Sequence, residues 1–197
     1  MSNVCLVGLL ILFVLQVAAN CFTPIWAVYT NMLGGDIRNT GIAILIFTWG
    51  TAFFAITSAI LNKKLQIPDA YVLILGILFN LFAIVLYFFI SSVTSFYGVQ
   101  LLLAMGAGIQ IPPFYLIYER NIITQSRSIA WGALDASLYF AIGFGSFIAA
   151  FLHYHKGIYT VFAFMLTLTI LALVLAIIFT FLDKRNFPPK NPTHHPY

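Results

Sequence analysis

The sequence predicts an all-α membrane protein with six transmembrane helices. Charged residues make up only 7% of its 197 residues and hydrophobic residues 62%, and its mean hydropathy is +1.01. A soluble fold of this size could not bury so much apolar surface, so lipid must solvate part of it. The apolar runs are continuous and about 20 residues or longer, which crosses a hydrocarbon core of about 30 Å, and they lack the alternation of β-barrel strands. The predicted spans are about 4–30, 41–61, 70–90, 97–118, 129–152 and 158–182.

The basic residues predict the orientation of these spans. Arg38 and Lys156 lie in odd-numbered loops, on one side of the membrane. The remaining seven lie in the even-numbered loops and after the last span: Lys63, Lys64, Arg120, Arg127, Lys184, Arg185 and Lys190. The positive-inside rule then places both termini in the cytoplasm. Because these charges flank membrane spans, the net charge of +4 does not indicate nucleic acid; the expected partner is the lipid bilayer.

Short loops indicate a single membrane domain. Residues 1–182 form the six-helix bundle, and residues 183–197 form a polar, proline-rich cytoplasmic tail. No soluble domain fits between the spans, so any chemistry belongs to the bundle and its loops. Cys5 and Cys21 lie about 24 Å apart along the first helix at 1.5 Å per residue, too far to pair with each other.

Prolines indicate a weak internal symmetry. The first and fourth spans each open a set of three helices, and each is expected to be interrupted in its second half, by Pro24 in one and by Pro112 and Pro113 in the other. The two spans run in opposite directions. Broken helices at matching positions of inverted repeats indicate a transport pathway, whereas membrane helices also tolerate proline for structural reasons.

Several segments resemble the major facilitator superfamily, in particular its short bacterial six-helix members. The likeness covers about residues 15–182 and depends on the order and spacing of its segments. Those in the first two spans are 23–29 (TPIWAVY), 33–36 (LGGD) and 40–43 (TGIA). Those in the fourth and fifth spans are 100–103 (QLLL), 106–110 (GAGIQ) with Pro112, 131–135 (WGALD) and 143–145 (GFG).

The resemblance implies a fold of two inverted three-helix repeats, equivalent to one half of a full transporter. The other half would come from a second copy or from a partner membrane protein. As a homodimer, the protein would move small solutes by alternating access in the bacterial inner membrane. The loop after the second span departs from the family pattern Gly-x-x-x-Asp-Arg-x-Gly-Arg-Arg, because residues 58–67 read SAILNKKLQI. Asn62 replaces the aspartate, which places conventional gating in doubt.

Polar residues in the first and fourth spans are candidates for a substrate cavity. Gln16, Asn20 and Thr23 follow at i, i+4 and i+7 and therefore share one helix face. Gln110 is the corresponding polar group in the fourth span. In the resembling family these helices line the cavity; the alternative is that the four side chains form interhelical hydrogen bonds.

Asp135 is the carboxylate that lies well inside a predicted span. It sits about 9 Å along the fifth helix from Ile129, at 1.5 Å per residue. Intramembrane acids often mark proton or ion routes, so proton coupling is one expectation. The other is a structural ion pair with Arg127 or Arg120, which share its side of the membrane.

The fifth span also carries a stripe of small residues that would let a second helix approach closely. That helix could belong to this chain or to a second copy. The stripe consists of Ala133, Ser137, Ala141, Gly145 and Ala149.

The remaining patterns argue against catalysis. His153 and His155 are two residues apart and point to different sides of a helix, which does not favour a metal site. No nucleophile elbow, zinc-protease motif or phosphate loop is present in the sequence. We therefore expect no enzyme activity, catalytic residue, cofactor or metal. Besides transport, two functions stay open: a non-transporting scaffold subunit of a larger membrane complex, and the substrate-binding component of a vitamin importer.

Overall fold

The computed structural model describes residues 3–123 and 127–186, and within them the protein is entirely helical. Among these residues, six helical segments are long and apolar enough to cross a membrane, which confirms the predicted fold class. The helices are α1 (Asn3–Asn20), η1 (Thr23–Ile25), α2 (Trp26–Met32), α3 (Ile37–Leu65), α4 (Asp69–Leu86), α5 (Val93–Arg120), α6 (Arg127–Lys156) and α7 (Ile158–Asn186). Of the predicted tail, residues 187–197 lie outside the described part of the chain.

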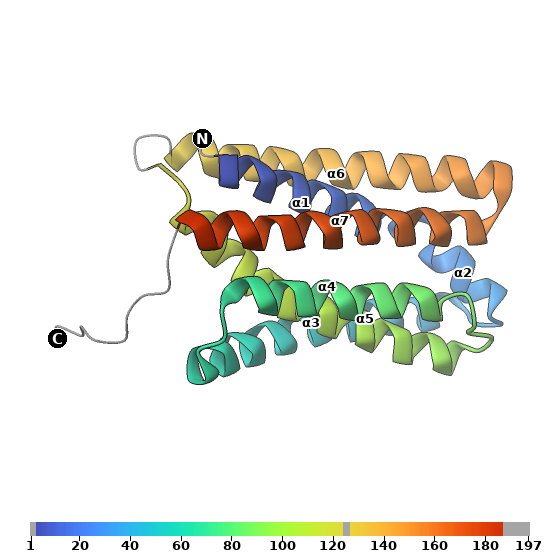
Figure 1. Ribbon diagram of the computed structural model, residues 1–197. Helices are drawn as coiled ribbons and strands as arrows, with labels where there is room; N and C mark the ends of the chain where they lie inside the picture. The colour runs from blue at the N-terminus through green and yellow to red at the C-terminus, as the bar shows by residue number, and fades with distance from the viewer. Residues whose placement is uncertain (1–2, 124–126, 187–197) are drawn as a thin grey trace.

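The helices form two groups of three (Figure 1). In one group α1 packs on α6 and α7, and in the other α5 packs on α3 and α4; α4 and α7 join the groups. Exchanging α1 with α5, α3 with α6 and α4 with α7 converts the α1–α6 and α1–α7 pairs into α5–α3 and α5–α4 and maps the α4–α7 pair onto itself; the weaker α6–α7 contact has no such counterpart between α3 and α4 in the described part of the chain. The packing therefore has the two-fold relation expected of inverted three-helix repeats. Each repeat contributes helices to both groups.

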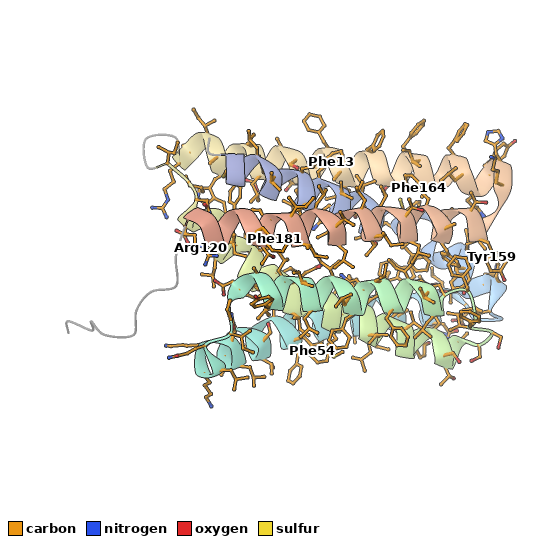
Figure 2. All side chains as sticks on the ribbon, in the orientation of Figure 1. Phe13, Phe54, Arg120, Tyr159, Phe164 and Phe181 are labelled. Carbon is orange, nitrogen blue, oxygen red and sulfur yellow. The ribbon has the colours of Figure 1, made fainter. Side chains whose placement is uncertain are left out.

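Both ends of the bundle carry ion pairs. Figure 2 shows Arg120 at one end and Tyr159 at the other. Arg120 donates to Asp69 over 3.0 Å, between the end of α5 and the start of α4. At the opposite end, Asp36 caps α3 by accepting hydrogen bonds from the backbone N–H groups of Arg38 and Asn39. Hydrogen bonds from the Asn39 backbone and the Arg38 side chain lower the pKa of the Asp36 carboxyl.

The two proline sites differ in their effect on the helix. At Pro24 the first span changes from α1 to the short 3-10 helix η1, so the predicted break is present. At Pro112 and Pro113, α5 continues without interruption from Val93 to Arg120, so the expected break in the fourth span is absent. Pro112 has no N–H for the carbonyl of Gly108. The hydroxyl of Ser58, on α3, lies 3.3 Å from that carbonyl oxygen and 3.1 Å from the Ala55 carbonyl oxygen of its own helix. Its one hydrogen is shared between these acceptors and compensates in part for the missing helical bond.

Close helix approach depends on glycine in both groups. A Cβ on Gly108 of α5 would lie 2.7 Å from the Thr51 carbonyl oxygen of α3. A Cβ on Gly145 of α6 would lie 2.5 Å from the Val17 carbonyl oxygen of α1. Ala141 and Ala149, from the same small-residue stripe, are fully buried. These three stripe positions thus lie against this chain, whereas Ala133 and Ser137 stay partly exposed.

Gly145→Ala is expected to destabilise the fold, because the added methyl group would overlap the α1 backbone. Overpacking of this kind costs about 1–3 kcal/mol. Gly143→Ala is the matched control, since a Cβ at Gly143 has open space around it and alanine favours a helix. Thermal unfolding in detergent should show a lower midpoint for Gly145→Ala only. Equal midpoints for the two variants would contradict the close α1–α6 contact.

Candidate functional site: a polar cavity between the helix groups

A cavity of about 300 Å³ lies between the two helix groups. Its lining comes from α1, η1, α2, α3, α4, α5 and α7, and it includes all four predicted cavity residues, Gln16, Asn20, Thr23 and Gln110. Sequence reasoning missed the other polar lining residues, which are Trp26, Thr51, Asn80, Gln100 and Thr169. The amides among them could have been identified as isolated polar groups within apolar spans.

The cavity occupies a polar layer between two apolar clusters. Towards one end lies a cluster that includes Phe22, Tyr87 and Phe162. Towards the other end lies a second cluster that includes Ile77 and Phe179. On α1, α4, α5 and α7, the polar lining residues that fall between the positions belonging to these two clusters are Gln16, Asn80, Gln110 and Thr169, whereas Asn20 and Gln100 lie beside members of the first cluster. Along the bundle axis, the cavity therefore lies between two apolar clusters.

Gln16, Asn20 and Thr23 bond mainly with one another. The Asn20 Nδ2 donates to the Gln16 backbone oxygen over 2.8 Å and to its Oε1 over 3.2 Å. Thr23 Oγ1 donates to Asn20 Oδ1 over 3.5 Å. These bonds run within the broken first span, so among the described residues the interhelical alternative is not seen for these side chains. The break itself is tied to α6, because the Ser146 hydroxyl donates to the Asn20 backbone oxygen.

Other polar atoms of the lining lack a partner. They are Asn80 Oδ1, Gln100 Oε1, Gln110 Oε1 and Trp26 Nε1, all inaccessible and without a hydrogen bond in the described part of the chain. Gln100 is 0% exposed. A buried polar atom without a partner costs about 1–3 kcal/mol. Such atoms are expected where a ligand or water supplies the missing bonds.

The cavity lining carries no charge. All of its residues belong to the described part of the chain, and none is Asp, Glu, Lys, Arg or His. The described residues likewise contain no group of three metal-ligating side chains. The arrangement can hold a neutral solute by hydrogen bonds, and it provides neither a nucleophile with its base nor a counter-ion.

Asp135 lies apart from the cavity, on the exposed side of α6. The possible pair with Arg127 or Arg120 is not formed among the described residues, where Arg127 pairs with Glu119 and Arg120 with Asp69. The reason is geometric. Arg120 ends α5 directly beside the start of α4, where Asp69 lies, whereas the Asp135 side chain faces outward.

The end of α3, where the sequence departs from the family pattern, joins the same network at that end of the bundle. Asn62, which replaces the family's aspartate, donates from Nδ2 to Asp69 Oδ1 over 2.9 Å. Asp69 thus accepts from Asn62 and from Arg120. The substitution of amide for carboxylate suits this position, because an aspartate there would face the carboxylate of Asp69.

Gln110→Met is expected to raise the thermal stability, because it removes a buried oxygen without a partner at nearly constant volume. Thr169→Val is the control, since that hydroxyl already donates to the Met165 backbone oxygen over 2.8 Å. Unfolding midpoints in detergent should rise for Gln110→Met and stay near the parent value for Thr169→Val. A fall for Gln110→Met would show that its oxygen already has a partner.

Comparisons with known proteins agree with this architecture. The chain is similar to a crystallised POT family transporter, PepTSo, with a TM-score of 0.75 and 20% identity over 97% of this chain and 40% of that transporter. It therefore spans about two fifths of that protein. No curated protein sequence matches it significantly. The family description "Major Facilitator Superfamily" matches residues 8–196, and this chain therefore belongs to the Major Facilitator Superfamily.

Proposed function

We propose that the protein is a half-size transporter of small solutes that acts as a homodimer by alternating access. The observation that carries this proposal is the uncharged polar cavity, whose buried amides lack partners. Stability alone would favour apolar side chains there, so the amides are best explained by a solute that binds between them. The apolar clusters at both ends supply the barriers that a transporter opens in turn.

The exposed faces of α3 and α6 favour a second copy as the missing half. On α3, Trp49 and Phe53 are 72% and 63% exposed, and on α6, Phe140 and Phe147 are 72% and 70% exposed. Figure 2 shows a row of aromatic side chains projecting outward from α6. Such a face would suit lipid as well as protein.

The position of Asp135 favours protein over lipid as the neighbour of this face. Its exposed carboxylate shares α6 with the aromatic row, about 12 Å from Arg127 along the helix at 1.5 Å per residue. A charge within lipid costs about 2.5–3.5 kcal/mol even on the lowest scale. A second protein unit with water between the copies lowers this cost. The match to two fifths of a longer transporter supports the same arrangement. A proton-coupling role for Asp135 would act from this interface, outside the cavity.

Both termini are proposed to lie in the cytoplasm of a bacterium, with the bundle in its inner membrane. The six spans bring the start of α1 and the end of α7 to the same end of the bundle (Figure 1). That end also carries Lys63, Lys64, Arg120 and Arg127 at the ends of α3, α5 and α6. The opposite end carries Arg38 and Lys156. The excess of positive charge supports this orientation.

Cysteine labelling tests the orientation. We expect Lys156→Cys to react with a membrane-impermeant maleimide in intact cells, and Lys64→Cys to react only after permeabilisation. Cys5 and Cys21 are buried and can stay in place. Labelling of Lys64→Cys from outside intact cells would reverse the topology.

Cross-linking tests the homodimer. A variant with both Trp49→Cys and Phe147→Cys should form a covalent dimer with a bifunctional maleimide in native membranes, because both positions lie on the proposed interface. The matched control carries Leu75→Cys and Ile177→Cys, which lie on the exposed sides of α4 and α7. The dimer yield should be several-fold lower there. Equal yields would contradict the interface, and cross-links to a different protein alone would favour the scaffold function instead.

A further inference from the structure

We propose that the cavity selects uncharged, hydroxyl-rich solutes such as polyols and excludes organic ions of the same size. This inference rests on the proposed function, because it takes the cavity as the binding site. It is carried by three features of the lining: the absence of charge, the amide groups without partners, and the aromatic rings beside them.

The charge pattern excludes ionic solutes. None of the lining residues is charged. The described carboxylate and guanidinium groups that form ion pairs lie at the two ends of the bundle instead, in the pairs at Asp36, Asp69 and Glu119. A charged solute would lose its hydration in the cavity without meeting an opposite charge, which costs several kcal/mol. A neutral solute avoids this cost.

The amides supply hydrogen bonds that hydroxyl groups can complete. The Gln100 side chain is held in place because its Nε2 donates to the Tyr87 hydroxyl over 2.8 Å, which leaves its Oε1 without a partner. The Asn80 and Gln110 side-chain oxygens are also acceptors without a donor, and Trp26 Nε1 is a donor without an acceptor. These four atoms are buried, so they reach a solute only when their side chains turn toward the cavity. A hydroxyl group both donates and accepts, so a polyol can then bond with each of them.

The aromatic rings match the carbon side of such a solute. The ring centroid of Trp26 lies 5.6 Å from that of Phe22 and 5.9 Å from that of Phe47. All three residues line the cavity. Their faces can cover C–H groups while the amides bond with hydroxyls. The volume of about 300 Å³ falls at the small end of ligand pockets, which suits a solute of a few carbon atoms.

Equilibrium binding to the purified full-length chain in lipid nanodiscs tests this selectivity. The neutral probes are erythritol, xylitol and sorbitol; gluconate and glucosamine are the anionic and cationic probes of similar size. We expect at least one polyol to bind saturably, and more than tenfold tighter than either ion. Gln110→Met should weaken polyol binding about tenfold, as expected for one lost hydrogen bond, although it is expected to be more stable than the parent.

The matched control is Thr167→Val, because that exposed hydroxyl bonds with the Ala163 backbone oxygen outside the cavity. It should leave polyol binding unchanged. The selectivity is overturned if no polyol binds, if gluconate or glucosamine binds as tightly, or if Gln110→Met leaves polyol binding intact. Exchange of labelled polyol across proteoliposomes then tests transport separately: binding without exchange contradicts the transporter and leaves the binding inference standing.

Discussion

The structure depends on one constraint: polar groups inside a membrane must find partners within the protein, because lipid offers none. The hydroxyls of Thr51, Thr169 and Thr180 donate to backbone oxygens of their own helices. The Ser58 hydroxyl lies within hydrogen-bond distance of the Gly108 carbonyl oxygen, which Pro112 leaves without a donor. Against this background the exceptions are informative. Four of the buried side-chain atoms without partners in the described residues meet at one cavity.

The second organising feature is the exchange between repeats. Because α1 packs with α6 and α7, and α5 with α3 and α4, neither sequence half forms a separate bundle. The cavity then lies where the two groups face each other, and the broken first span runs beside it. Close contacts at glycine, such as Gly108 against Thr51 and Gly145 against Val17, bring the helices of each group together.

Sequence patterns identified some of this architecture and missed other parts for physical reasons. Gln16, Asn20 and Thr23 could be placed on one face because helical periodicity is local. Asn80 and Gln100 were missed, since nothing in their own helices shows which neighbour they face. Proline chemistry predicted the break at Pro24, yet it failed at Pro112, where a hydroxyl from α3, distant in sequence, compensates in part for the missing bond. The direction in which Asp135 faces could not be read from the sequence, because it depends on how α6 packs.

The sequence by itself determined the six membrane-crossing helices, their inverted arrangement and the family, because apolar length, charge placement and segment order are properties of the chain. Only the tertiary structure decided which polar side chains meet, which stay without partners and which helix faces remain open. Those properties depend on the packing of α5 against α3 and α4 and of α1, α6 and α7 against one another. The polar cavity is therefore a product of helix packing, and no single span contains enough of it to reveal it.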